Sequence, residues 1–361
     1  MTGDADLLSD AVALSAAIRD RRISCVEVMT ATLDRVERLN PKVNAIIALR
    51  PRETLIAEAR ACDDDISRGL YRGVLHGFPQ AIKDLEPGKG IPTSMGVLGP
   101  MARNIPDLAL LLGVQAGYDA RAPLSIVADL DLAQLDLNRD FRGTRIAWSG
   151  DMAGYLPFED GVLDTCRAAL KTFEDMGCVV EEANPDFSID AVWRAWLVLR
   201  AWQAGTGLLE VYKNPSLRPH MKPEAVFEVE RGAKLTAYEI SAASMVRTQW
   251  YEAVRRFFET YDYWLLPTAQ LFPFDVDLDW PHEIAGRPMQ TYHEWMKVVL
   301  PVTMSGCPAL AAPAGFGARD LPIGIQIVAP NHGERDCLEL GHAYDQRTNL
   351  VRTHLPPLLN R

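Results

Sequence analysis

The stretch that decides the fold class is Gly143 to Glu182, which reads GTRIAWSGDMAGYLPFEDGVLDTCRAALKTFEDMGCVVEE. Its pattern predicts a strand over Gly143–Ala147, a helix over Asp160–Met176 and a second strand over Cys178–Glu182. Gly177 stands where a helix C-cap is expected. A strand, a helix and a strand in this order form a β–α–β unit. We therefore expect the two strands to be parallel and the crossover to be right-handed.

Further elements are expected on the C-terminal side of this unit. A buried strand is predicted over Tyr263–Leu266, a hairpin over Ala309–Ala314 and Ile323–Val328, and a closing helix over Glu334–Arg347. Residues 185–258 are expected to be mostly helical. They contain four tryptophans, which we interpret as core anchors rather than a binding site. These are Trp193, Trp196, Trp202 and Trp250.

On the N-terminal side, Ser24 and Glu27 have the spacing of a capping box and open a helix that Pro41 is expected to end. Three more elements are predicted there: a helix over Thr54–Ile66, a short strand over Gln80–Leu85, and a helix from about Pro106 to Gly117.

Composition narrows the class of protein. Of the 361 residues, 48% are hydrophobic and 24% are charged, as in a globular protein with a large core. The formal net charge of −11 argues against nucleic acid as a partner, because phosphate binding needs clustered lysine and arginine. Six cysteines without a CxxC pair lack zinc-ribbon spacing, and we interpret them as reduced thiols. With no signal peptide and no apolar run of membrane-spanning length, we expect a cytoplasmic protein.

Two short sequences follow each other closely in the chain: Gly77–Leu85 reads GFPQAIKDL and Val97–Arg103 reads VLGPMAR. We call the stretch from Gly77 to Arg103 the seam. Both short sequences resemble sequences of the amidase signature family of serine amidohydrolases, as do Ser305–Leu310 and Leu321–Val328 near the C-terminus. In that family a glycine- and serine-rich segment with both catalytic serines lies between the first two. The resemblance implies that this chain lacks the segment, between about Gly96 and Val97.

The same resemblance implies an α/β fold, with a large mixed β-sheet sandwiched between helices and with central elements missing. It implies a single domain over residues 1–361, with an internal deletion near residues 94–97. It also implies that residues 185–258 are a variable helical region over the active-site mouth. Loss of central elements is expected to leave a packing defect or an exposed sheet edge.

Lys83 is the central catalytic candidate. By resemblance it matches the lysine of a Ser–Ser–Lys triad, and a lysine made neutral by burial can serve as a base. Local sequence alone is better explained by a lysine at a strand end that reaches solvent or pairs with Asp84. Neither the nucleophile nor the bridging serine has a match, because the chain has no Gly-Gly pair and no Gly-x-Ser-x-Gly elbow.

Other serine and cysteine candidates are weaker. Ser94 is nearest in sequence to Lys83 but has no run of glycine amides, which an oxyanion hole requires. Ser149 and Ser305 each precede a glycine and are interpreted as turn residues. Cys307 is interpreted as a packed thiol.

The histidines and one charged pair have structural interpretations. His76 is expected to hydrogen-bond within its own loop. His282 and His293 are too far apart to form a metal pair on one helix, and Arg103 and Asp107 are interpreted as structural residues that pair near a helix start. We expect no metal and no cofactor.

The resemblance implies hydrolysis of a linear carbon–nitrogen amide bond through a serine acyl-enzyme, and the missing serines predict that this chain is inactive. Two alternatives stay open: a non-catalytic binding or scaffolding relative, and a glutamine-amidotransferase-like subunit that needs a partner subunit. The expected partner in the intact family is a small-molecule amide substrate, with no nucleic acid and no membrane. A homo-oligomer also stays open.

Overall fold

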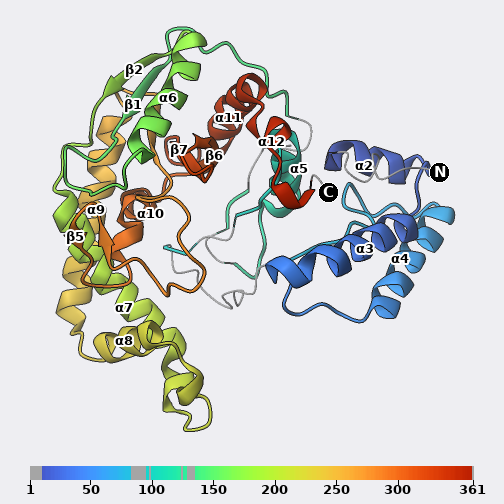
Figure 1. Cartoon of the computed structure of the whole chain (residues 1–361), viewed down its shortest axis with the longest axis horizontal. Helices are drawn as coiled ribbons and strands as arrows, with labels where there is room; N and C mark the ends of the chain where they lie inside the picture. The colour runs from blue at the N-terminus through green and yellow to red at the C-terminus, as the bar shows by residue number, and fades with distance from the viewer. Residues whose placement is uncertain (1–9, 83–94, 97–98, 123–124, 128–134, 360–361) are drawn as a thin grey trace. The chain divides into compact units, whose positions relative to one another are not determined.

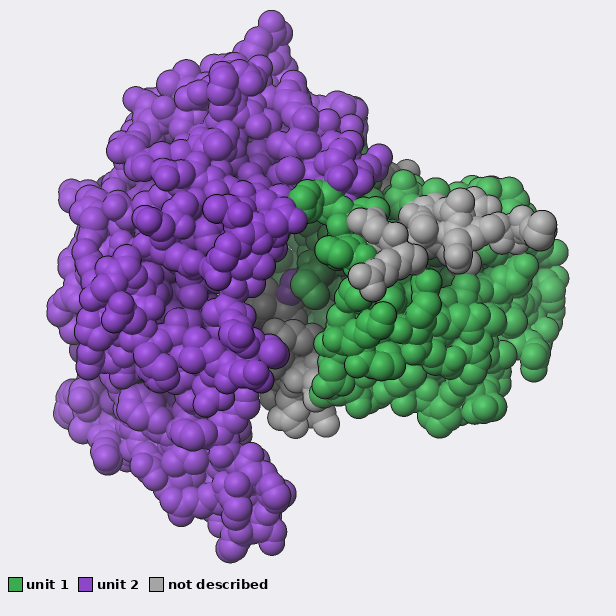
Figure 2. Space-filling view, viewed as in Figure 1, with its two compact units in different colours: residues 1–91, 100–135, 354–361 green, residues 92–99, 136–353 purple. Residues whose placement is uncertain are grey.

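A computed structural model of the chain describes residues 10–82, 95–96, 99–122, 125–127 and 135–359 (Figure 1). The chain divides into two compact units, which are coloured separately in Figure 2. Unit 1 consists of residues 1–91, 100–135 and 354–361, and unit 2 consists of residues 92–99 and 136–353. The single domain over residues 1–361 stays a prediction.

The described part of unit 1 is helical. It contains α2 (Ala11–Arg19), α3 (Cys25–Val43), α4 (Arg52–Ser67), α5 (Ile105–Gln115) and the short η4 (Pro357–Leu359). The predicted capping box opens α3: Ser24 Oγ accepts a hydrogen bond from the Glu27 N–H at 3.1 Å, and the Ser24 N–H donates to the Glu27 carboxylate at 2.8 Å. The two N-terminal orphan donors are thereby satisfied within one turn.

Carboxylates hold the helices of unit 1 together. Asp63 of α4 accepts hydrogen bonds from the Cys25 and Val26 N–H groups at 2.7 and 3.0 Å, where the start of α3 favours negative charge. Asp107 of α5 accepts from the Val12 N–H of α2 at 3.1 Å and from Asn104 Nδ2 at 3.0 Å. The structural interpretation of Asp107 is therefore confirmed.

Two sequence-based expectations for unit 1 are wrong. Pro41 does not end α3, which runs on to Val43. A proline in a last turn removes only one donor, and the Asn44 N–H closes the helix on the Asn40 carbonyl at 2.7 Å. The predicted strand over Gln80–Leu85 does not form in its described part. Residues 80–82 are exposed coil and no described strand pairs with them, while residues 83–85 lie outside the described residues.

The described residues of unit 2 form a mixed five-stranded sheet in the order β2-β1-β3-β7-β6. Its strands are β1 (Arg145–Trp148), β2 (Val179–Glu182), β3 (Tyr263–Pro267), β6 (Ala309–Phe316) and β7 (Pro322–Val328). The predicted β–α–β unit is confirmed: β1 and β2 are parallel, with α6 (Val162–Asp175) between them and Gly177 at φ 89°. The predicted hairpin is also confirmed, because β6 and β7 are antiparallel.

Helices cover both faces of this sheet (Figure 1). On one face, α6 stacks against α11 (Glu334–Thr348) through the rings of Phe173 and Tyr344, whose centroids are 4.9 Å apart. The Tyr344 hydroxyl donates to the Pro313 carbonyl of β6 at 2.8 Å. On the other face, α7 (Ile189–Lys213), α9 (Ala237–Phe257) and α10 (Leu300–Ser305) pack against Trp264 and Leu266. The α/β sandwich with a mixed sheet is thus confirmed.

Residues 185–258 are helical, as expected, and consist mainly of α7, α8 and α9. The remaining described elements are η2 (Arg218–His220), α8 (Pro223–Gly232), β4 (Glu283–Ile284), β5 (Arg287–Pro288), η3 (Glu294–Val299) and α12 (Leu350–Thr353).

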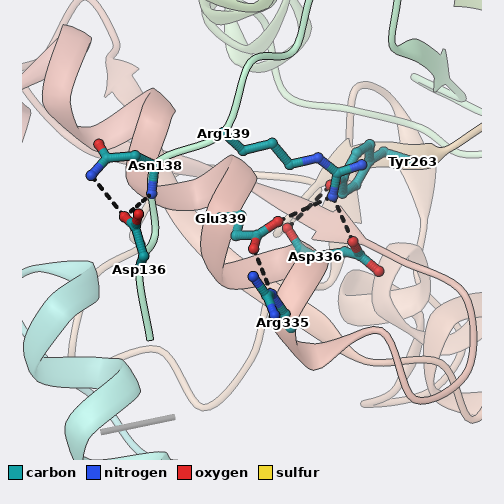
Figure 3. A network of polar contacts seen from close by, with 7 residues as sticks. All are labelled: Asp136, Asn138, Arg139, Tyr263, Arg335, Asp336 and Glu339. Atoms are coloured by element: carbon teal, nitrogen blue, oxygen red, sulfur yellow. Dashed lines mark hydrogen bonds and ion pairs between the residues drawn. The ribbon is translucent and has the colours of Figure 1, made fainter. Parts of the chain in front are cut away.

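A polar network ties the chain ahead of β1 to α11 (Figure 3). Arg139 lies 2.7 Å from Asp336 and 3.1 Å from Glu339, and Arg335 lies 2.6 Å from the second oxygen of Glu339. The Tyr263 hydroxyl of β3 donates to the Asp336 carbonyl at 3.3 Å. The buried Glu339 carboxylate is thereby compensated by two guanidinium groups, which is what makes its burial tolerable.

Candidate active site

The catalytic candidate Lys83 and its neighbour Ser94 lie outside the described residues. The described residue on the far side of this gap is Met95, whose partly buried side chain packs against the apolar cluster between the sheet and helices α7, α9 and α10. Met95 therefore packs in the core of unit 2. The role of Lys83 stays a prediction.

Ser149 follows the carboxyl end of β1 and is 4% exposed. Its hydroxyl donates to the Ala183 carbonyl at 2.8 Å and accepts from Trp264 Nε1 at 2.6 Å. Gly150 follows at φ 47°, in the left-handed region. The hydroxyl proton is thus committed to a carbonyl rather than to a base, and a serine nucleophile needs a base. The interpretation as a turn residue is confirmed.

Ser305 ends α10 in a similar way. Its hydroxyl donates to the Val302 carbonyl at 2.7 Å and accepts from the Cys307 N–H at 3.2 Å, while Gly306 turns the chain at φ 69°. Burial raises the pKa of the Cys307 thiol, and the hydrogen bond from Ser305 opposes this only in part. Both residues are therefore structural, as predicted.

His76 makes one hydrogen bond within its own loop, as expected, and a second to α4. Its Nδ1 accepts from the Arg72 N–H at 3.1 Å, and its Nε2 lies 2.9 Å from the Cys62 carbonyl. A carbonyl only accepts, so the arrangement requires the neutral tautomer with the proton on Nε2. The ring also stacks on Tyr71 at 5.5 Å.

The sequence analysis missed a buried acid–imidazole pair in unit 2. Glu228 of α8 and His293, just before η3, are each 3% exposed, and Glu228 Oε1 lies 2.6 Å from His293 Nε2. Arg200 of α7 approaches the same oxygen with its Nε at 3.4 Å. These residues are far apart in the sequence and none lies in a motif, so only the packing of α7 on α8 reveals the cluster.

This cluster lines a cavity of about 330 Å³. The cavity is bounded by α7, by the start of α8 and by residues from the segments before and after the β4–β5 hairpin. A cavity of this volume is at the lower end of the range of about 300–1,000 Å³ that is typical of small-molecule sites.

A second missed feature is Lys297 of η3. Its Nζ lies 4.3 Å from the ring centre of Trp193 and 5.4 Å from that of Tyr155. Burial lowers the pKa of this lysine, although Glu294 and Asp190 act in the opposite direction. Aromatic faces thus stabilise the ammonium in place of water.

Three of the four predicted core tryptophans are buried. Trp193 and Trp196 stack on each other at 5.5 Å, and Trp250 Nε1 donates to the Pro301 carbonyl at 2.8 Å. Trp202 is the exception, because its side chain is 42% exposed.

Within the described ranges, no group of three or more His, Cys, Asp or Glu side chains is placed to hold a metal ion. In the same ranges, no helix combines the length and the apolar character that crossing a membrane requires.

The amidase family model matches residues 27–98 and 86–338 of the chain. The A subunit of glutamyl-tRNA(Gln) amidotransferase from Halothermothrix orenii is 27% identical over 288 residues, which cover 74% of this chain and 58% of that protein. AmiD of Mycobacterium bovis is 23% identical over 457 aligned positions, with 94% of each chain covered. That alignment is longer than this chain, so AmiD has stretches of residues that this chain lacks.

A crystal structure of a bacterial aryl acylamidase of the amidase signature enzymes shares the fold, with a TM-score of 0.84 at 18% identity. The match covers 96% of this chain and 99% of that one. The chain spans 50 to 58% of the length of three curated relatives that it matches.

Proposed function

Because this chain belongs to the amidase family, we propose that it derives from an enzyme that hydrolyses linear carbon–nitrogen amide bonds and that the chain itself has lost this activity. The family reaction implied by the sequence passes through a serine acyl-enzyme. It needs a serine nucleophile, a base and donors to the oxyanion.

The observation that carries this proposal is the seam. Family-like sequence runs up to Gly96 and resumes at Val97, with neither catalytic serine between Lys83 and Arg103. The extra length of AmiD in its alignment with this chain supports the loss of an internal stretch. Ser149 and Ser305 do not replace the lost serines, since both donate their protons to backbone carbonyls.

The test is an assay of the purified full chain against a panel of aryl and aliphatic amides. We expect no turnover above the buffer rate, because removal of the nucleophile abolishes the acyl-enzyme route. Lys83→Ala is compared with Lys89→Ala, a matched lysine in the same stretch. Turnover that Lys83→Ala abolishes and Lys89→Ala spares would contradict the loss of activity.

A non-catalytic binding role is the second candidate, and the observation that favours it is the cavity beside Glu228 and His293. A role as an amidotransferase component remains an alternative, supported by the relatives of that name. In that case hydrolysis or transfer would require a partner protein to be added to the assay.

A further inference from the structure

The cavity between α7 and α8 has a charge pattern that selects a class of ligand. Its lining combines apolar, acidic and basic side chains from three parts of unit 2. On α7 the lining residues recur at helical spacing, at Arg200, Ala204 and Leu208, so one face of this helix forms a wall. Pro223 and Ala225 at the start of α8 continue the apolar surface.

The buried charge in this cavity is already balanced. Glu228 is 3% exposed and is met on the same oxygen by Arg200 and His293. A buried carboxylate with a guanidinium and an imidazole beside it needs no further cation. Although His293 Nε2 lies 2.6 Å from Glu228 Oε1, both ring nitrogens of His293 are buried without a hydrogen-bond partner in the described structure. Buried polar atoms of this kind are rare in native proteins unless a water or a ligand completes them.

Around this floor, three charged side chains lack an ion-pair partner, and one of them, Glu224, lies in the first turn of α8, where the helix start favours a negative charge. Lys222, Glu224 and Asp279 all line the cavity, and none of them forms an ion pair with another described residue. One is positive and two are negative. In addition, α8 begins at Lys222 without a side-chain cap, so the partial positive charge of the helix start lies next to the lysine.

We propose that this cavity binds a small dipolar molecule, with a carboxylate at one end, a protonated amine at the other and a short aliphatic body between them. Lys222 and the start of α8 hold the carboxylate. Asp279 and Glu224 hold the amine, and Ala204 and Leu208 contact the aliphatic part. A simple anion would face the two unbalanced carboxylates, and a simple cation would face Lys222. Only a dipolar ligand satisfies both signs. This inference does not depend on amide hydrolysis.

The experiment is calorimetric titration of the full chain with three matched probes. L-leucine carries both charges, 4-methylpentanoate carries only the carboxylate, and 3-methylbutylamine carries only the amine. We expect saturable binding of leucine, at least tenfold tighter than either single-charge probe, because each charged end adds a charge-assisted contact.

Charge-removing variants test the assignment of the two ends. Lys222→Gln is expected to weaken the binding of leucine about tenfold and to leave the binding of 3-methylbutylamine unchanged. Asp279→Asn is expected to weaken the binding of leucine about tenfold and to leave the binding of 4-methylpentanoate unchanged. Lys234→Gln and Asp277→Asn are the matched controls, because neither residue lines the cavity. Thermal melts of all four variants verify that they remain folded.

Three outcomes would overturn the proposal: no saturable binding of leucine, equal binding of leucine and a single-charge probe, or equal effects of the cavity variants and their controls. If leucine does not bind, the result of the amide assay is unaffected, so the two proposals can fail independently. Turnover of amides, in turn, would not explain leucine binding that depends on Lys222 and Asp279.

Discussion

At the scale of single residues, the hydroxyl of Ser149 shows how a serine at a strand end is used structurally. It joins the carboxyl end of β1 to the Ala183 carbonyl after β2 and to the indole of Trp264 in β3. Three neighbouring strands are therefore fastened at one atom. Trp264 is fully buried, so its indole donor has no access to water as a replacement partner.

Ser149→Ala is expected to lower the free energy of unfolding by about 1–3 kcal/mol, because a buried indole N–H and a carbonyl lose their partner. Urea denaturation measures the change. The control is Ser244→Ala on α9, where an exposed hydroxyl donates to the Ile240 carbonyl and the loss should stay within about 0.5 kcal/mol. Equal stabilities of the two variants would disprove the role of Ser149.

The thiols are a second feature at this scale. Burial raises the pKa of Cys25, Cys166 and Cys337 to about 12 in each case. Only the thiolate reacts with alkylating reagents, and at pH 8 about one thiol in 10,000 with such a pKa is ionised. These residues are therefore poor candidates for a nucleophile.

We expect iodoacetamide at pH 8 to leave Cys25, Cys166 and Cys337 unmodified in the native chain and to modify all three after denaturation. Peptide mass spectrometry after timed labelling reads each site separately. Fast labelling of any of the three in the folded protein would show that the thiol is accessible and ionised, and would reopen the search for a cysteine nucleophile.

At the scale of elements, α7 and α8 pack unusually closely through two glycines. A Cβ added at Gly232 would lie 2.3 Å from the Ala201 carbonyl oxygen, and one added at Gly205 would lie 2.9 Å from that of Glu228. The backbones approach because neither helix carries a side chain at the crossing. The same crossing places Arg200 beside Glu228 and so builds the floor of the cavity.

Gly232→Ala is expected to destabilise the fold by about 1–3 kcal/mol, since the added methyl group must push two backbones apart. Gly207→Ala on α7 is the matched control. No atom lies within 4 Å of its added Cβ, so helix propensity alone should stabilise the chain by up to about 1 kcal/mol. Thermal or urea unfolding compares the two, and the same sign for both would contradict the crossing as described.

At the scale of the whole molecule, several large apolar side chains are in contact with water. In unit 1, Ile82 is 89% exposed, Met101 is 86% exposed and Val127 is 81% exposed. Singly exposed apolar side chains are common, whereas a contiguous patch of them marks a surface that something covers. Here they border ranges outside the described residues, among them the range that contains Lys83.

We therefore expect the chain to bind a hydrophobic dye such as anilinonaphthalene sulfonate, and the triple variant Ile82→Ser, Met101→Ser, Val127→Ser to bind less of it. Lys83 should titrate with an ordinary lysine pKa, because the proposed loss of the signature segment would remove the burial that lowers the pKa of a lysine. Fluorescence and NMR titration measure the two effects. A depressed Lys83 pKa in a monomer without dye binding would point instead to a rebuilt site.

Local sequence was sufficient for much of this fold. Alternating and helical periodicity, with Gly177 as a cap, predicted the parallel β–α–β unit, and Ser24 with Glu27 predicted the start of α3. The interactions that form these features are between residues close together in the chain, so a short stretch of sequence is enough to predict them. The local pattern failed at residues 80–82, which are coil and pair with no described strand, because strand formation needs a neighbouring strand that no local signal reports.

The sequence by itself thus determined the family, the α/β class and the absence of a match to the catalytic serines. Tertiary structure alone decided that the Ser149 hydroxyl hydrogen-bonds to Ala183 and Trp264 on either side of it, and that the Glu228 carboxylate contacts the His293 ring. It also decided that Lys222 and Asp279 line one cavity. The physical reason is that hydrogen bonds and burial act over a few ångströms in space, whatever the separation along the chain. A buried pair 65 positions apart leaves no periodicity or motif in the sequence.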